Sequence, residues 1–234
     1  MKSNVTYLTV ATLLGALQMA SAAELSGKVK LNGTPKAEMP IPLDATCGKL
    51  QPGPVTTRHY VVGADKGLGN VFVYVKSTDL KAPPAGEAQM LDQAGCFYEP
   101  YVMGVVAGQK FKIRNSDPLL HNVHSTPKPG TGNKEFNFAQ TSKGQVNEKQ
   151  FDNPEVLVRL KCDVHAWMFA YVGVCTHPYF AVTDKDGNFK ISGLPAGKYT
   201  IEAFHLKAGA KTQDIEVGAD DKKSLEFTLD APAQ

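Results

Sequence analysis

Two sulfur-containing residues and two histidines stand at spacings typical of metal ligands. Residues 162–168 read Cys-Asp-Val-His-Ala-Trp-Met, so that Cys162, His165 and Met168 share one short segment. A further histidine, His121, stands upstream, shortly after a turn-rich stretch. Copper that alternates between Cu(I) and Cu(II) is held well by two imidazoles and a thiolate, with a weak axial thioether. We therefore predict a mononuclear copper site with the ligands His121, Cys162, His165 and Met168.

Other metal sites fit this segment less well. Structural zinc sites usually contain paired cysteines, and a thioether is a poor ligand for zinc. A dinuclear copper centre would need a second bridging cysteine within the loop, but these positions hold Val158 and Ala166. His124 lies three residues after His121 and could reach the site or a partner, yet four ligands already complete the set. We therefore expect His124 to be a histidine on the adjoining strand.

The segments around these residues have the pattern of an all-β protein. Short apolar runs alternate with turn residues, and no stretch keeps the apolar spacing of a full helix. The runs 156–161 and 168–174 flank the ligand segment, which places it in a tight loop between two strands. The polar stretch 127–149 is expected to be a long surface loop. Further strands are expected at 25–31, 70–75, 110–114, 189–192, 199–204, 213–217 and 225–229.

Several motifs before the ligand segment follow a known pattern. They are Gly-Cys-Phe-Tyr-Glu-Pro at 95–100, Val-Ala-Gly-Gln at 106–109, Asn-Ser-Asp at 115–117 and His-Asn-Val-His at 121–124. Together with the short ligand spacing of 162–168, they resemble the cupredoxins, and the amicyanin-like members in particular. The resemblance implies that residues 87–178 fold as a cupredoxin Greek-key β-sandwich, the fold of the blue (type 1) copper proteins.

The resemblance to cupredoxins also implies a role for each residue of the site. His121 and His165 would be the imidazole ligands, Cys162 the thiolate and Met168 the axial ligand. Asn122 would hydrogen-bond across to the cysteine-containing loop and hold the two ligand segments together. In that family, the histidine of the cysteine loop usually lies near the surface and passes the electron, so we expect this of His165. Trp167 has two open roles, as part of a docking face near copper or as a packing residue.

A second pattern occurs on both sides of the copper region. Gly-Lys-Val at 27–29 with Gly-Thr-Pro at 33–35, the run 183–189 and Leu-Pro-Ala-Gly-Lys-Tyr at 194–199 resemble the transthyretin-like, carboxypeptidase-regulatory-like β-sandwich. That family has one more strand between the first and second of these stretches, and the run 70–75 fits it. We therefore predict that the copper domain 87–178 is inserted in a sandwich made by 24–80 and 179–231. A tandem arrangement with an irregular N-terminal lead is the simpler alternative.

The four cysteines do not form a disulfide framework if Cys162 binds metal. Cys47, Cys96 and Cys175 then remain, and an odd number permits at most one disulfide among them. We favour Cys47–Cys96, which would tie the lead segment to the inserted domain, although spacing alone leaves other pairings open. Cys175 follows the ligand loop on a predicted strand and is expected to be a buried free thiol.

The N-terminus and the charge indicate where such a protein works. Residues 1–22 have the features of a secretory signal, with Lys2, an apolar stretch and the small residues Ala20 and Ala22 at a cleavage site. The apolar stretch is short for a bilayer core of about 30 Å, so we expect no membrane span in the mature form. Lys and Arg number 25 and Asp and Glu 23, a net charge of +2 without a basic cluster, which argues against nucleic-acid binding.

These observations favour one function and leave alternatives. The favoured function is an exported copper protein, in the periplasm or secreted, that carries single electrons between redox proteins such as a cytochrome, a dehydrogenase or an oxidase. We expect a monomer that catalyses nothing itself, because a complete ligand set leaves no open position for substrate. Copper storage, sensing or delivery without redox turnover is the main alternative. A β-sandwich binding module stabilised by copper and a small redox enzyme are two others.

Overall fold

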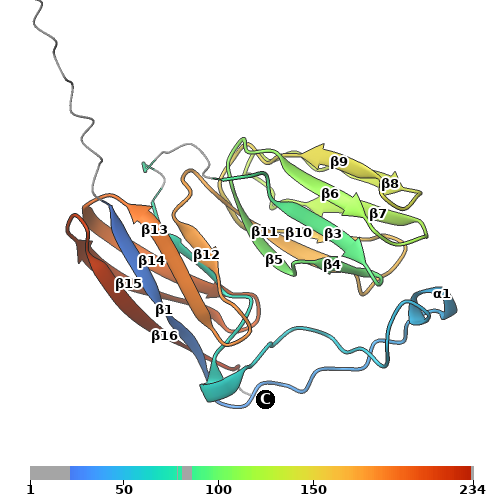
Figure 1. Cartoon of the computed structure of the whole chain (residues 1–234), viewed down its shortest axis with the longest axis horizontal. Coiled ribbons are helices and arrows are strands. Elements are labelled where there is room, and N and C mark those ends of the chain that lie inside the picture. Colours follow the sequence, from blue (N-terminus) through green and yellow to red (C-terminus); the bar gives the residue numbers. More distant parts are fainter. Residues whose placement is uncertain (1–21, 78, 81–85, 233–234) are drawn as a thin grey trace, which may run out of the picture.

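The computed structural model describes residues 22–77, 79–80 and 86–232, and the signal expected at 1–22 falls almost wholly outside them. The described residues form two β-sandwiches that lie next to each other (Figure 1). None of the described helices is long and apolar enough to cross a membrane. The fold is therefore all-β, as the alternation of apolar runs and turns predicts.

The outer sandwich takes strands from both ends of the chain. One of its sheets has the order β13-β1-β16, and the other has the order β12-β2-β14-β15. The bounds are β1 Ala23–Asn32, β2 Phe72–Val75, β12 Phe180–Val182, β13 Asn188–Leu194, β14 Gly197–His205, β15 Gly209–Val217 and β16 Lys222–Asp230. Apolar side chains of both sheets meet in one buried core, for example Leu25 of β1 and Val73 of β2.

The inner sandwich contains the region expected to bind copper. Its sheets have the orders β5-β11-β10-β7-β8 and β4-β3-β6-β9. The bounds are β3 Met90–Ala94, β4 Phe97–Glu99, β5 Val102–Val106, β6 Phe111–Asn115, β7 His121–Thr126, β8 Asn137–Gln140, β9 Val146–Lys149, β10 Glu155–Lys161 and β11 Phe169–Cys175. The inner sandwich is thus nested in the outer one, because all its strands fall between β2 and β12 along the chain.

The stretch 127–149 is not the long loop that its polarity suggested. It contains β8, which pairs with β7, and β9, which pairs with β6. Both are the last strand of their sheets, and their side chains are largely exposed or half-buried. Edge strands of this kind need few apolar residues, so the expectation of a loop was wrong because composition alone cannot reveal them.

The chain between β1 and β2 leaves the outer sandwich and runs along the inner one (Figure 1). We call residues 38–59 the strap. It contains the short helix α1 (Ala45–Gly48), and the 3-10 turn η1 (Ala64–Lys66) follows it. Leu43, Cys47 and Leu50 pack against the inner core, and Cys47 is bonded to Cys96 there. Much of the segment 24–80 therefore belongs, by its contacts, to the inner sandwich.

Aromatic rings join the two sandwiches. Phe72 of β2 is fully buried, with Phe180 of β12 beside it at 5.6 Å between ring centroids. The rings lie over Gly104 of β5 and Gly173 of β11, where a Cβ atom would overlap Phe180 and Phe72 respectively. These glycines permit the close approach, and the apolar contact fixes how the inner sandwich sits on the outer one.

Candidate metal centre

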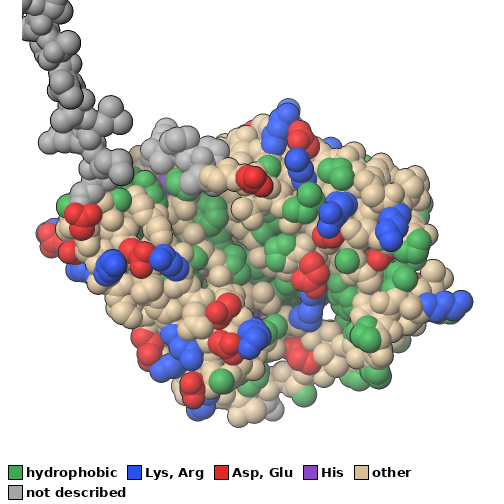
Figure 2. All heavy atoms as spheres, viewed as in Figure 1, with side chains coloured by type: hydrophobic (Ala, Val, Ile, Leu, Met, Phe, Trp, Pro, Cys, Tyr) green, Lys and Arg blue, Asp and Glu red, His purple; other side chains and the backbone are tan. Residues whose placement is uncertain are grey.

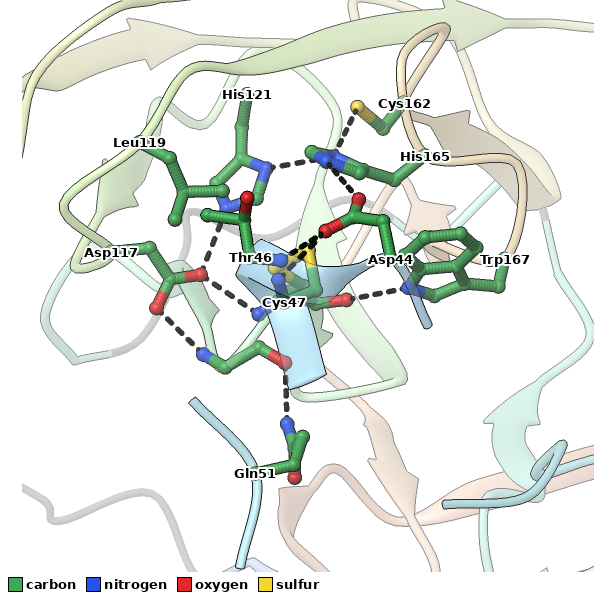
Figure 3. The surroundings of a disulfide bond; sticks show 12 residues. Asp44, Thr46, Cys47, Gln51, Asp117, Leu119, His121, Cys162, His165 and Trp167 are labelled. Atoms are coloured by element: carbon green, nitrogen blue, oxygen red, sulfur yellow. Dashed lines mark hydrogen bonds and ion pairs between the residues drawn. A yellow bond between two sulfur atoms is a disulfide. The ribbon is translucent and has the colours of Figure 1, made fainter. Parts of the chain in front are cut away.

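Three of the four predicted ligands converge in one buried cluster at the end of the inner sandwich. His121 begins β7, while Cys162 and His165 lie in the tight turn between β10 and β11. The Nδ1 atoms of the two histidines are 3.2 Å apart, and Cys162 Sγ lies 3.7 Å from His165 Nδ1 (Figure 3). One candidate ligand atom of each residue lies within 4.8 Å of the others.

The ligand turn is held by its own backbone. The N–H of Cys162 donates to the carbonyl of Met168 at 3.0 Å, and the N–H of Met168 donates to the carbonyl of His165 at 2.9 Å. Met168 is fully buried and packs in the same apolar cluster as Cys162. Its role as axial ligand stays a prediction.

Asn122 links the two ligand segments. Its Oδ1 accepts a hydrogen bond of 3.0 Å from the backbone N–H of Asp163, directly after Cys162. This is the cross-loop bond that the resemblance implied. Because Asn122 also directly follows His121, it holds the start of β7 against the cysteine turn.

Asp117 is a part of the site that the sequence did not single out. Its Oδ2 lies 2.8 Å from His121 Nε2, and its carboxylate accepts the backbone N–H groups of Gly95 at 2.7 Å and Cys96 at 2.8 Å. With Nε2 bonded to this carboxylate, His121 can present the lone pair of Nδ1 toward Cys162 and His165. The sequence did offer one indication of this role, since Asp117 stands only four residues before the predicted ligand His121.

The electrostatics of the cluster favour a metal-binding thiolate. Burial raises the pKa of Cys162, but hydrogen bonds from His121 and from backbone N–H groups outweigh it, so the pKa is lowered overall. Burial opposes charge on His121, yet its bonds to Asp117 and Cys162 raise the pKa of that imidazole. Burial and then the neighbouring His121 lower the pKa of His165, which favours a neutral imidazole. A thiolate and the neutral imidazole of His165 fit a copper ion, which would displace from His121 the proton that its raised pKa favours.

His165 lies between the exposed residues Val164 and Ala166 but is itself largely covered. Only 6% of the residue is exposed, because the strap and the ligand turn cover it. Asp44 Oδ2 of the strap lies 3.6 Å from His165 Nε2, and the Trp167 ring lies 5.3 Å from the His165 ring (Figure 3). The Nε1–H of Trp167 donates to the carbonyl of Cys96 at 3.1 Å. Trp167 therefore packs beside both His165 and the backbone of Cys96.

The disulfide attaches the strap, which covers His165, to the inner sandwich. Cys47 of α1 and Cys96 are bonded, with 5.7 Å between their Cα atoms. Their sulfurs lie within 4.8 Å of a ring nitrogen of His165. The Oδ1 of Asp44 accepts the backbone N–H groups of Thr46 and Cys47, both at 2.8 Å, and so begins α1.

The remaining cysteine and histidine candidates lie outside the cluster. Cys175 is a buried free thiol at the contact between the sandwiches, and burial raises its pKa to about 12. His124 Nδ1 lies 2.9 Å from Asp163 Oδ2, and its Nε2 lies 2.5 Å from Glu135 Oε1. His124 therefore contacts the ligand turn through Asp163, on the side away from the cluster.

Comparison with known proteins gives a family match for one part of the chain. Residues 173–230 match the model of the carboxypeptidase regulatory-like domain. This stretch includes the last five strands, β12 to β16, all of which belong to the outer sandwich. This part of the outer sandwich is therefore similar to that domain. The comparison with curated proteins found no match.

Several solved structures to which the chain is similar are copper proteins. A purple cupredoxin from Nitrosopumilus maritimus is 23% identical, with 38% of this chain and 99% of that chain covered and a TM-score of 0.32. An amicyanin variant in its Cu(I) form is 21% identical, with coverages of 44% and 97% and a TM-score of 0.34. A copper-containing nitrite reductase from Thermus scotoductus is 16% identical, with coverages of 43% and 25% and a TM-score of 0.34.

Proposed function

We propose that this protein is an exported mononuclear type 1 copper protein that transfers single electrons between redox proteins. The observation that carries the proposal is the buried convergence of His121, Cys162 and His165, with ligand atoms within 4.8 Å of one another. These three residues would hold the ion, with Met168 as the weak axial ligand. When bound, copper supplies a one-electron couple between Cu(I) and Cu(II).

Hydrogen bonds from neighbouring residues fix the positions of the proposed ligands. Asp117 fixes the imidazole of His121, Asn122 ties β7 to the cysteine turn, and backbone bonds close that turn on Met168. The apolar core around Cys162 excludes water from the thiolate. A site whose ligands are this constrained needs little rearrangement when the charge of the ion changes. The proposal includes no catalytic step.

The disulfide and the surface support the location and partners that we propose. A buried disulfide suits an oxidising compartment such as the periplasm. Acidic and basic side chains are interspersed over the face in Figure 2, without a large area of one sign. Such a surface suits a monomer that docks briefly on partners such as a cytochrome, a dehydrogenase or an oxidase.

Copper handling is the second candidate, and the cover over His165 favours it. A ligand that is 6% exposed and lies against Asp44 of the strap has little surface for a partner to contact. Storage or delivery would need copper to leave, whereas electron transfer needs it to stay through many cycles.

One experiment separates the two candidates. The copper-loaded protein is reduced with ascorbate and reoxidised repeatedly in the presence of a Cu(I) chelator, and bound copper is measured after each cycle. An electron carrier keeps its copper and its spectrum through all cycles. Transfer of the copper to the chelator on the first reduction would instead establish copper handling and refute electron transfer.

A further inference from the structure

The disulfide lies directly against the predicted copper cluster (Figure 3). Both of its sulfurs and a ring nitrogen of His165 lie within 4.8 Å of one another. Cys47 and Cys96 are fully buried, and His165 is 6% exposed. Among the described residues, two further sulfurs and an imidazole thus meet at a place beside the group that contains Cys162.

The two cysteines are held in place by contacts other than the bond between their sulfurs. The backbone N–H of Cys47 donates to Asp44 Oδ1, and that of Cys96 donates to Asp117 Oδ2, both at 2.8 Å. The carbonyl of Cys96 accepts the Nε1–H of Trp167 at 3.1 Å. These contacts keep the two sulfurs near each other when the disulfide is reduced, even if the strap then loosens.

The disulfide state decides whether these sulfurs can bind a metal, because the sulfur ligand of a metal is a thiolate. Exchange with an external dithiol breaks the bond between the two sulfurs. The dithiol gives up two electrons and two protons and becomes a disulfide, while Cys47 and Cys96 become thiols. Every molecule of the protein passes through this dithiol form once, since a disulfide is made by oxidation of two thiols.

The geometry of the dithiol form suits one ion between the two sulfurs. The 5.7 Å between the Cα atoms of Cys47 and Cys96 lets the side chains turn apart and place both sulfurs about 2.3 Å from a single ion. Soft sulfur ligands select Cu(I) or zinc. Structural zinc sites are almost always four-coordinate, whereas the group at the disulfide has three members among the described residues. Cu(I) is therefore the better fit.

We propose that the dithiol form of this protein binds a second Cu(I) ion through the thiolates of Cys47 and Cys96 and the imidazole of His165. Binding releases the protons of the two thiols. Transfer of two electrons from the thiolates to an external disulfide then forms the bond between Cys47 and Cys96 and releases the ion. His165 is thereby left to the group of Cys162, a consequence that rests on the proposed function.

The test uses Cys162→Ser, which lacks the thiolate of the first site. The variant is reduced with a phosphine, freed of it in the absence of oxygen, and titrated with Cu(I) against a coloured Cu(I) chelator. We expect the reduced variant to take one Cu(I) ion from the chelator, with thiolate-to-copper absorption in the ultraviolet. The oxidised variant should take none. Hydrogen exchange at residues 43–51 of the reduced variant should slow on Cu(I) binding, because the ion reconnects the strap.

Further substitutions in the Cys162→Ser chain identify the ligands. Cys47→Ser should abolish Cu(I) binding, and Cys175→Ser, which changes the remaining free thiol, should leave it unchanged. His165→Asn should weaken binding at least about tenfold, since even an outer partner of a ligand is worth that much. His124→Asn changes a histidine outside the cluster and is the matched control.

Three results would overturn the proposal. They are a reduced variant that takes no Cu(I), whether or not circular dichroism shows it folded, an oxidised variant that binds equally well, and binding that is unchanged in His165→Asn. The last result would show a plain pair of thiols, as an unfolded chain also offers. Because the thiolate of Cys162 is absent throughout, failure here leaves the copper spectrum of the parent protein untouched, and the two proposals fail separately.

Discussion

At the scale of single residues, Asp117 links the imidazole of His121 to the backbone next to the disulfide. Its carboxylate is 4% exposed and accepts N–H groups from Gly95 and Cys96 while it holds His121 Nε2. Burial raises the pKa of Asp117, but the bonds to His121 and to these N–H groups lower it further, so the carboxylate stays charged. The orientation of one ligand thus depends on a group that does not touch the ion.

Asp117→Asn should weaken copper binding without unfolding the protein. An amide can still accept one N–H, but it lacks the charge and the second acceptor oxygen. We expect a loss of about 10- to 100-fold in copper affinity, the usual effect of removing a partner of a ligating histidine. Competition with a chelator measures it, and the exposed Asp152→Asn is the matched control. An unchanged affinity in Asp117→Asn would refute the positioning role.

The sequence predicted which candidate ligands lie together better than it predicted the residues around them. Cys162, His165 and Met168 lie within one short segment, so that spacing alone brings them near one another. Asn122 is adjacent to His121, and its bond to the cysteine turn was implied by the resemblance to cupredoxins. Asp44 and Asp117 reach the site from separate segments, which only the folded chain brings together.

At the scale of elements, the strap decides how accessible the site is. It is anchored at Cys47 and covers His165 with Asp44. The resemblance to cupredoxins concerns residues 87–178, so it carried no information on the strap, which comes before them in the chain. The low exposure of His165 was therefore not predicted.

Replacing Cys47 and Cys96 together with serine should loosen the strap. The disulfide spans 49 residues, and loss of such a bond costs about 2–5 kcal/mol in small exported domains. We expect a chelator to remove copper at least about tenfold faster from the double variant, with increased hydrogen exchange at residues 43–51. Equal rates of copper removal in variant and parent would show that the strap does not control access.

The hairpin of β14 and β15 contains a pH-sensitive histidine. His205 Nδ1 accepts the backbone N–H groups of Lys207 and Ala208 at 3.3 Å and 3.1 Å. Burial is the main cause that lowers the pKa of His205 from 6.5 to about 4. The folded state therefore binds fewer protons than the unfolded state between these values, and stability falls as the pH drops through this window.

His205→Asn should flatten this pH dependence, because the asparagine Oδ1 can replace the acceptor and does not titrate. The contribution of His205 is up to about 3 kcal/mol between pH 6.5 and pH 4. Urea unfolding of parent and variant at both pH values measures it. An identical loss of stability on acidification in both proteins would assign the effect to other groups.

At the scale of the whole molecule, the outer sandwich packs against the inner one through aromatic rings. Phe72 and Phe180 pack over Gly173 and Gly104, and the chain enters and leaves the inner sandwich beside them. Motifs on both sides of the copper region suggested this nesting. The shared aromatic core could not be predicted from them, since it depends on how two surfaces meet.

Gly173→Ala tests this contact. A Cβ atom there would overlap the Phe72 ring, and such overpacking costs about 1–3 kcal/mol. Unfolding followed both by copper absorption and by circular dichroism should show a lower midpoint for each probe. Gly53→Ala, where a Cβ atom meets nothing within 4 Å, is the control. No change of midpoint in Gly173→Ala would mean that the sandwiches are not coupled through this contact.

The central claim is that His121, Cys162 and His165 hold one copper ion through a thiolate and two imidazoles. The most direct measurement is the optical and EPR spectrum of the protein loaded with one equivalent of Cu(II), beside that of Cys162→Ser. We predict an intense visible thiolate-to-copper charge-transfer band with narrow copper hyperfine splitting, both lost in the variant. A parent spectrum without that band, or a band that survives in Cys162→Ser, would contradict the claim.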